Sequence, residues 1–255
     1  RLPKRIPNLK RIIKIDAEEN HALALSIDGR VFEWGDHSLF KSKAPIKLGI
    51  GYFIVSIAAG LNYSMALTNK GFVLSWGENS FGQLGHSLDK PTGVPTKIPN
   101  LEKVTQISGG REDSIVLISD GSLTVMGRIP AIRHGKGRTY YNTFDGDKIT
   151  LLKHNFALTS SGKVYEVTTS KKKLISGNLK VTDICGRQTP YFLVNNGDIY
   201  QKQQKKVKKI SSSSQRVLYH ACSTVFVSDS RTLVLNAQTG RAKWITDPVK
   251  YNQYH

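Results

Sequence analysis

Short runs of alternating apolar and polar residues follow one another along this chain, and each ends at a turn signal. The clearest stretch covers residues 57–85, IAAGLNYSMALTNKGFVLSWGENSFGQLG. Residues 63–68 alternate as a strand, and Lys70-Gly71 supplies the positive φ that a two-residue hairpin turn needs, before residues 72–74 return. Trp76-Gly77 closes the hairpin, and Asn79, Gly82 and Gly85 mark a sharply bent exit loop. The pattern predicts a β-hairpin unit that cannot bury its own apolar faces alone.

The same unit recurs six times, with turns at Asp28-Gly29, Lys70-Gly71, Asp120-Gly121, Ser161-Gly162, Asn196-Gly197 and Asp229-Ser230. Four positions before the second turn residue stand Leu25, Leu67, Leu117, Leu158, Leu193 and Phe226, and eight before it stand His21, Tyr63, Asp113, His154, Thr189 and Cys222. The intervals between turns are 42, 50, 41, 35 and 33 residues. Agreement at fixed positions is stronger than a shared period, so we predict six repeats with hairpins centred on residues 29, 71, 121, 162, 197 and 230.

The second unit carries a recognisable signature in Ala59-Gly60, Ala66-Leu67-Thr68, Gly71, Trp76-Gly77, Asn79 and Gly82-Gln83-Leu84-Gly85. These residues resemble the regulator of chromosome condensation repeat, and the other units repeat the signature with decreasing fidelity over residues 12–235. Tyr63 stands where that family usually has histidine, and only the second unit keeps the GQLG exit. The resemblance implies a β-propeller, which in this family usually has seven blades.

We therefore expect an all-β fold: a single β-propeller domain over residues 1–255 with six four-stranded blades, seven being the alternative. Pairing of the N- and C-terminal strands would close the ring. Ile6-Pro7-Asn8-Leu9 resembles Ile98-Pro99-Asn100-Leu101, which feeds the third unit. We expect residues 4–10 to belong to a blade that the C-terminus completes around Lys243-Trp244-Ile245; the alternative is a frayed tail.

Charge changes the picture, because the chain has 37 Lys and Arg against 19 Asp and Glu, a net charge of +18. From residue 151 onward the balance is 17 against 5, and before it 20 against 14. A basic patch is expected from Lys171, Lys172, Lys173, Lys205, Lys206, Lys208 and Lys209. Lysine also protects exposed strand edges from unwanted pairing, which is the simpler reading. The excess predicts an acidic partner: an acidic protein surface or, less favoured, an anionic membrane surface or nucleic acid.

A second basic segment follows the third unit, within residues 127–148 (GRIPAIRHGKGRTYYNTFDGDK). Basic residues, glycines and then aromatics on a loop of a rigid scaffold are typical of a recognition element. The candidate protein-binding residues are Arg128, Arg133, His134, Lys136, Arg138, Tyr140 and Tyr141. The alternative is an ordinary blade-edge strand with solvated charges.

Catalytic patterns are not found. The sequence contains no GxSxG, HExxH or Walker A motif, and Gly135-Lys136-Gly137 lacks the ending of a phosphate loop. His21 and His154 share one repeat position and are expected to be structural, as are Trp34 and Trp76. Cys185 and Cys222 stand 37 residues apart without CxxC spacing, which describes neither a zinc site nor a disulfide scaffold. We expect no catalytic residues, metal or cofactor.

The resemblance implies more about function. Founding members of the family are guanine-nucleotide exchange factors for the small GTPase Ran; they hold the GTPase on one propeller face and insert a wedge-like loop near its phosphate and magnesium site. Some bacterial pathogens deliver short, degenerate propellers of this family into host cells to act on the Ran system, and this chain's length and eroded repeats resemble that group. The first hypothesis is a GTPase-directed propeller, an exchange factor or pathway activator that uses the basic loop.

Two alternatives stay open. One is an interaction or inhibitory scaffold for another protein, and the other a chromatin or nucleic-acid binder that uses the lysine-rich C-terminal half. We expect a monomer that is intracellular and soluble, in the cytosol (the host-cell cytosol for a bacterial effector) or alternatively the nucleus. No apolar run approaches the length of a membrane helix. The chain begins at Arg1 without methionine, so targeting or lipid-anchor signals could lie outside it.

Overall fold

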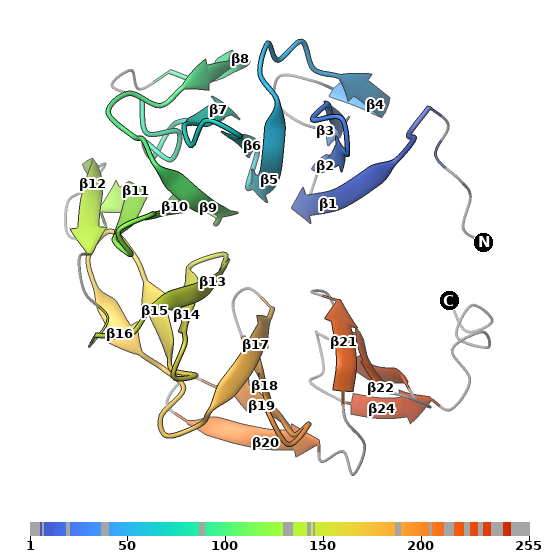
Figure 1. Cartoon of the computed structure of the whole chain (residues 1–255), viewed down its shortest axis with the longest axis vertical. Helices are drawn as coiled ribbons and strands as arrows, with labels where there is room; N and C mark the ends of the chain where they lie inside the picture. The colour runs from blue at the N-terminus through green and yellow to red at the C-terminus, as the bar shows by residue number, and fades with distance from the viewer. Residues whose placement is uncertain are drawn as a thin grey trace. The chain divides into compact units, whose positions relative to one another are not determined.

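The computed structural model describes residues 6, 8–18, 21–36, 41–86, 90–129, 135–141, 144, 146–186, 190–203, 206–211, 217–221, 225–228, 232–235 and 242–245. At residues 41, 129, 135–137, 185 and 211, and from 217 onward, only the backbone is described. The regular structure of these residues is entirely β, in six four-stranded antiparallel sheets (Figure 1). The all-β prediction is therefore confirmed, and the six sheets match the six predicted units.

Each sheet is a meander in which consecutive strands pair in chain order. The strands of the first three sheets are β1 Ile12–Glu18, β2 His21–Ser26, β3 Val31–Asp36 and β4 Lys41–Lys47; β5 Ile54–Gly60, β6 Tyr63–Thr68, β7 Val73–Gly77 and β8 Thr92–Lys97; and β9 Val104–Gly109, β10 Asp113–Ile118, β11 Leu123–Ile129 and β12 Gly135–Tyr141. The others are β13 Ile149–Lys153, β14 Phe156–Thr159, β15 Val164–Val167 and β16 Lys172–Leu174; β17 Val181–Cys185, β18 Tyr191–Val194, β19 Ile199–Lys202 and β20 Val207–Ser211; and β21 Val217–Ala221, β22 Val225–Ser228, β23 Thr232–Leu235 and β24 Ala242–Ile245. We refer to the sheets as blades 1–6 in chain order.

The predicted turn register holds in five blades, but the predicted turn type is wrong. In blade 2, the Gly71 N–H donates to Thr68 O and the Thr68 N–H donates to Phe72 O, both at 3.0 Å. This is a three-residue loop ending in a left-handed glycine, a G1 bulge, rather than a two-residue hairpin. The same pair of bonds recurs at Ser26/Gly29/Arg30, Ile118/Gly121/Ser122, Thr159/Gly162/Lys163 and Val194/Gly197/Asp198. The sixth predicted turn, Asp229-Ser230, lies outside the described residues.

The turn glycine also forms a hydrogen bond with the next blade. The carbonyl oxygen of Gly71 accepts a hydrogen bond from the Val104 N–H, the first residue of β9, at 2.8 Å. Gly29 O and Gly162 O accept in the same way from the first residues of β5 and β17, Ile54 and Val181. The connectors that lead into β1 and β9 also share a backbone form, because Asn8 and Arg11 have positive φ values of 67° and 52° and Asn100 and Lys103 have 54° and 55°. The resemblance between residues 6–9 and 98–101 therefore extends to conformation.

Apolar faces of neighbouring blades form the core. Leu23 and Leu25 of blade 1 pack in one cluster with Ile57, Leu74 and Trp76 of blade 2. A second cluster joins blades 2 and 3, with Tyr63, Met65, Ile107 and Val116 among its members. Trp76 is fully buried, as predicted for its repeat position, whereas Trp34 at the equivalent position of blade 1 is only half-buried. The prediction that Trp34 is a core residue is therefore wrong in part. Blade 2 packs on the face of β3 that carries Glu33, and Trp34 lies on the other face of that strand.

A buried polar network joins blades 1 and 2. The Glu33 carboxyl of β3 accepts hydrogen bonds from Trp76 Nε1–H, at 3.1 and 3.2 Å to its two oxygens, and from Ser64 Oγ–H at 2.7 Å. Since the Ser64 hydroxyl uses its proton on Glu33, His21 Nε2–H is the donor of the 3.1 Å contact to Ser64 Oγ. We call His21, Glu33, Ser64 and Trp76 the blade 1–2 network. His21 is thus structural, as predicted.

Blades 2 and 3 meet through backbone and a tyrosine hydroxyl. A Cβ added at Gly109 would lie 2.4 Å from Ala59 O, so the ends of β5 and β9 come closer than any side chain allows. Tyr63, which replaces the family's usual histidine, accepts a hydrogen bond from the Gly110 N–H at 2.9 Å and donates to Asp113 O at 2.7 Å. Burial raises the pKa of its hydroxyl far above the ordinary value. Tyr63 therefore stays neutral and ties blade 2 to the β9–β10 turn.

The chain divides into two compact units. The N-terminal unit comprises Ile6–Ala157 and Glu166–Lys173 and holds blades 1–3; the other includes Leu158–Tyr165 and the chain from Leu174 onward and holds blades 5 and 6. Blade 4 has residues in both. The single-domain ring stays a prediction, and so does its closure by residues 4–10, of which residues 4, 5 and 7 lie outside the described residues. No helix of the kind that could cross a membrane occurs in the described part of the chain.

Candidate protein-binding surface

The predicted basic loop forms the outer hairpin of blade 3. Strand β11 pairs with β12 in a register that places Arg128 opposite Lys136 and Gly127 opposite Gly137. Residues 135–141, which the sequence left open between loop and edge strand, are thus the outermost strand of the blade. Residues 130–134, which join β11 to β12 and include the predicted Arg133 and His134, lie outside the described residues.

Arg128 forms one side of the base of this hairpin. Its guanidinium pairs with the Glu112 carboxylate, Nη1 to Oε2 at 2.9 Å, and its Cζ lies 5.5 Å from the centre of the Phe81 ring. The Arg128 N–H donates to Glu112 O at 3.2 Å, and the Thr169 hydroxyl donates to Arg128 O. Contacts from the exit loop of blade 2, the β9–β10 turn and the β15–β16 loop therefore fix the chain just before the tip.

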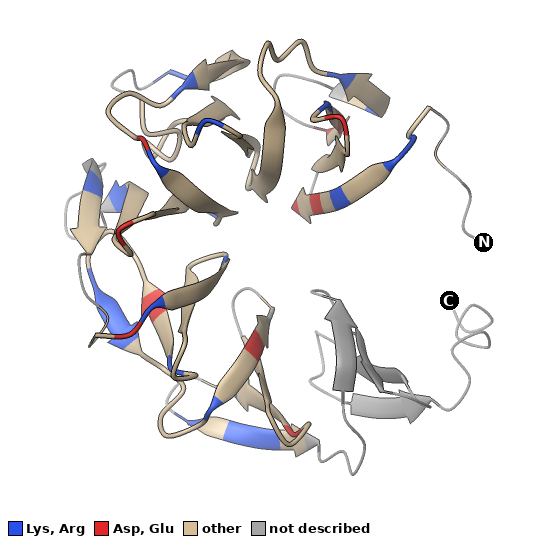
Figure 2. Ribbon diagram, viewed as in Figure 1, with Lys and Arg blue, Asp and Glu red and all other residues tan. Residues whose placement is uncertain are grey.

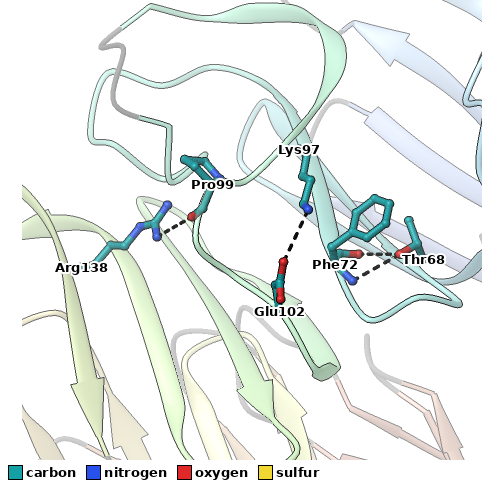
Figure 3. A network of polar contacts seen from close by, with 6 residues as sticks. All are labelled: Thr68, Phe72, Lys97, Pro99, Glu102 and Arg138. Carbon is teal, nitrogen blue, oxygen red and sulfur yellow. Dashed lines mark hydrogen bonds and ion pairs between the residues drawn. The ribbon is translucent and has the colours of Figure 1, made fainter.

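Arg138 and Tyr141 hold the other side. The Arg138 guanidinium donates to Pro99 O of the β8–β9 connector at 3.0 Å (Figure 3). It also donates to Gly85 O, in the GQLG exit of blade 2. Tyr141 donates from its hydroxyl to Thr168 O at 2.7 Å. Tyr140 points the other way and is 58% exposed. Of the seven predicted binding residues, Arg128, Arg138 and Tyr141 thus have structural partners, Tyr140 is presented to solvent, and Lys136 lies on β12 next to the tip.

Asp113 lies beside this base and has a raised pKa. Burial, followed by the nearby Glu112 carboxylate, raises its pKa to about 6, against the lowering effect of the Arg128 N–H and guanidinium. Its Oδ1 is buried, with no hydrogen-bond partner among the described residues. Sequence reasoning missed Glu112, Asp113, Phe81 and Thr169; only the position of Asp113, where the repeat usually has histidine, marked it as unusual.

Replacing Asp113 with asparagine is expected to stabilise the protein at neutral pH. The carboxyl titrates near 3.9 in the unfolded chain and near 6 in the folded one, so the folded state loses stability as pH rises from about 4 to about 6. Asp113→Asn should therefore raise the free energy of unfolding at pH 7 by about 1–2 kcal/mol, allowing for partial solvent screening. Urea titrations across this pH range measure it; wild-type and variant curves that stay parallel down to pH 3 would contradict the assignment.

The blade 1–2 network contains serine, histidine and glutamate, yet its geometry does not suit catalysis. A nucleophilic serine gives its proton to histidine, whereas the Ser64 hydroxyl donates to Glu33. Ser64 is also completely buried. No group of three potential metal ligands occurs among the described residues. The Ser64 hydroxyl therefore belongs to a structural network.

The predicted basic patch falls on two outer strands, β16 and β20, where Figure 2 shows Lys and Arg concentrated. Lys172 Nζ lies 4.5 Å from the centre of the Phe144 ring, and Lys209 pairs with Asp198 at 2.6 Å. Lys171, Lys173, Lys206 and Lys208 are exposed, and Lys205 lies outside the described residues. Strands β16 and β20 belong to different units, so the lysines are placed only strand by strand. The side chain of Cys185 and all of Cys222 lie outside the described residues, so the expectation that they form neither a zinc site nor a disulfide stays a prediction.

Two models of the regulator of chromosome condensation (RCC1) repeat match the chain, one at residues 70–117 and one at residues 54–83. These ranges cover blade 2 and most of the following inner hairpin of blade 3. They coincide with the part of the sequence in which the repeat signature is sharpest.

Solved structures share the fold. Prp20p from Saccharomyces cerevisiae is 16% identical with a TM-score of 0.67, covering 82% of this chain and 66% of Prp20p; its structure was described together with its binding to Gsp1p and histones. Human WBSCR16 is 18% identical with a TM-score of 0.67, covering 86% of this chain and 71% of that one. Yeast RCC1 (Prp20) bound to Kap60 is 17% identical with a TM-score of 0.65, over 88% and 63%. The chain thus spans 63–71% of these structures, and the likeness shows the propeller fold.

Proposed function

We propose that this β-propeller, which resembles the RCC1 family, binds a small GTPase of the Ran type and promotes release of its nucleotide. The observation that carries the proposal is the β11–β12 hairpin, whose base is held on one side by Arg128 and on the other by Arg138 and Tyr141. A loop presented by a fixed base loses little conformational freedom on binding. This is the arrangement expected of a recognition element on a rigid scaffold.

Exchange requires no reacting side chain. A protein that binds the nucleotide-free GTPase more tightly than the loaded form must weaken nucleotide binding by the same factor, because the two affinities are linked. In this proposal the tip acts near the acidic magnesium and phosphate region of the GTPase, where Arg133, His134 and Lys136 compete electrostatically with the metal. Tyr140 would add an exposed aromatic contact on the same strand.

The double variant Arg133→Ala/Lys136→Ala is expected to slow nucleotide release from purified Ran, loaded with a fluorescent guanine nucleotide, by about tenfold relative to the wild type. Arg138 is left unchanged because its guanidinium holds the hairpin base. The matched control is Lys171→Ala/Lys173→Ala on the exposed edge around β16, which removes the same charge without touching the tip. Equal rates for the wild type and the tip variant, with melting temperatures unchanged, would remove the hairpin from the mechanism.

A second candidate function is an interaction or inhibitory scaffold for another acidic protein. The association of Prp20p with histones as well as Gsp1p favours keeping it, since one propeller can serve two kinds of partner. Such a scaffold would bind a partner stably while leaving nucleotide release from Ran at its spontaneous rate. Binding to nucleic acid through the lysines is the weaker candidate and would fall steeply with salt. An origin as a bacterial effector that acts in the host-cell cytosol belongs to the first proposal.

A further inference from the structure

Apolar side chains are exposed together where the turns of blades 1 and 2 meet the β4–β5 connector. Ile27, Tyr52 and Phe53 expose 48%, 46% and 48% of their surfaces. Phe72 beside them is half-buried and packs on the blade 1–2 core. We call Ile27, Tyr52, Phe53 and Phe72 the turn-side patch. Single exposed hydrophobic residues are ordinary on a protein surface, whereas a contiguous group indicates a binding surface.

Contacts within the patch fix its aromatic rings. The Phe53 ring lies against the β2–β3 turn so closely that a Cβ added at Gly29 would come within 2.9 Å of it. The Asn69 N–H donates to Phe53 O at 3.0 Å, which fixes the backbone on the other side. Tyr52 meets Phe72 edge-to-face, with ring centres 4.8 Å apart. A partner would therefore find ordered anchors, which lowers the entropy lost on binding.

Two hollows adjoin the Tyr52–Phe72 pair. One, of about 270 Å³, is lined by Tyr52, Phe53 and Lys47, and also by Asp28 and Arg30, which form an ion pair. The other, of about 670 Å³, is lined by Lys97, Pro99, Asn100 and Glu102. Lys97, which lines the second hollow, has its Nζ 4.7 Å from the centre of the Phe72 ring (Figure 3). An extended segment lying across the aromatic pair could place one side chain in each hollow.

The surroundings of the patch are basic. Asp28 and Glu102 are each matched by a cation, in the pairs Arg30–Asp28 at 3.0 Å and Lys97–Glu102 at 3.8 Å. Lys47 and Lys70 are exposed beside the patch, with no carboxylate at ion-pair distance among the described residues. The local balance is therefore positive, as is that of the whole chain at +18. Such a rim attracts carboxylates and repels basic segments.

From the fixed aromatics, the two hollows and the basic rim, we infer that the turn-side patch docks a short acidic segment of a partner protein, with an aromatic or aliphatic side chain flanked by Asp or Glu. The surface belongs to blades 1 and 2 and lies at the ends of the strands from which the β2–β3 and β6–β7 turns emerge. The β11–β12 tip belongs to blade 3 and leaves from the opposite strand ends. The two surfaces therefore act independently, and this inference does not depend on any action on a GTPase.

Selection of a random peptide library against the full chain tests the inference, with counter-selection against the variant Tyr52→Ser/Phe53→Ser. The expected consensus is an aromatic or leucine residue between acidic residues. The selected peptides should bind the wild type about tenfold more tightly than the variant. The matched control is Tyr140→Ser, which removes an equally exposed aromatic from β12 and should leave peptide affinity unchanged.

A second, charge-reversed variant, Lys47→Glu/Lys70→Glu, leaves the Phe53 packing intact. It should bind the selected peptides more weakly by a similar factor and keep the wild-type melting temperature. Selected peptides that lack acidic residues, or that bind both patch variants as tightly as the wild type, would overturn the inference. Vesicles containing phosphatidylserine and a DNA duplex serve as competing probes. If the patch variants lose binding to either probe and to no peptide, the surface belongs to that other partner and the inference is wrong.

Discussion

Replacing Glu33 with alanine should lower the free energy of unfolding by about 3 kcal/mol, because the substitution leaves buried donors without an acceptor. Trp76 Nε1–H and Ser64 Oγ–H both donate to this carboxyl from the neighbouring blade. All three side chains are completely buried, so water cannot replace the lost acceptor. Urea denaturation followed by tryptophan fluorescence and circular dichroism measures the loss.

Two control variants separate this effect from a general sensitivity to glutamate removal. Glu33→Gln keeps an acceptor oxygen in nearly the same volume and should restore a large part of the stability. Glu102→Ala removes a carboxylate whose side chain is 75% exposed and only weakly paired with Lys97, and should change stability by no more than about 0.5 kcal/mol. If Glu33→Ala proved as mild as Glu102→Ala, the blade 1–2 network would not hold the blades together.

Replacing Gly109 with alanine should lower the free energy of unfolding by about 3 kcal/mol as well, through overlap rather than lost bonds. The new Cβ would meet Ala59 O, Ala59 C and Gly60 N at 2.4, 2.6 and 2.8 Å, all of them backbone atoms. A flexible side chain could move aside, but here the ends of β5 and β9 must separate. The separation would also disturb the Tyr63 hydroxyl, which bonds to Gly110 and Asp113.

The matched control is Gly49→Ala, because a Cβ there has open space and the backbone needs no left-handed conformation. Its effect on thermal unfolding should be small. A melting temperature for Gly109→Ala as high as that of Gly49→Ala would show that blades 2 and 3 are not in close backbone contact.

The sequence was sufficient to predict the hairpin register of five units, since glycine with positive φ stands at the same turn position in each, at residues 29, 71, 121, 162 and 197. It could not distinguish a two-residue turn from the three-residue loop found at Gly71, because both need a left-handed residue at that place. The three-residue loop is distinguished by the hydrogen bond from the Thr68 N–H to Phe72 O. Both groups belong to the backbone, so no residue type in the sequence indicates this bond.

The candidate site was less predictable for a different reason. In the sequence, Arg138 looks like a cation that is solvated or binds a ligand. In the structure its guanidinium donates hydrogen bonds to backbone carbonyl groups 39 and 53 residues away. Arg128 and Tyr141 likewise contact loops of neighbouring blades. Their partners are fixed only by how one repeat packs on the next. Burial of Asp113 has the same origin, which is why its raised pKa could not be anticipated from an Asp in a histidine position.

If the chain promotes nucleotide release from a GTPase, it must bind the nucleotide-free GTPase more tightly than the loaded form, and titration calorimetry can measure both affinities. The affinity of the full chain is measured once for nucleotide-free Ran and once for Ran loaded with GDP. The account predicts tighter binding to the nucleotide-free form, by about 100-fold, since that ratio is the factor by which the bound propeller weakens the nucleotide. Equal affinity for the two forms, or binding to neither, would contradict it.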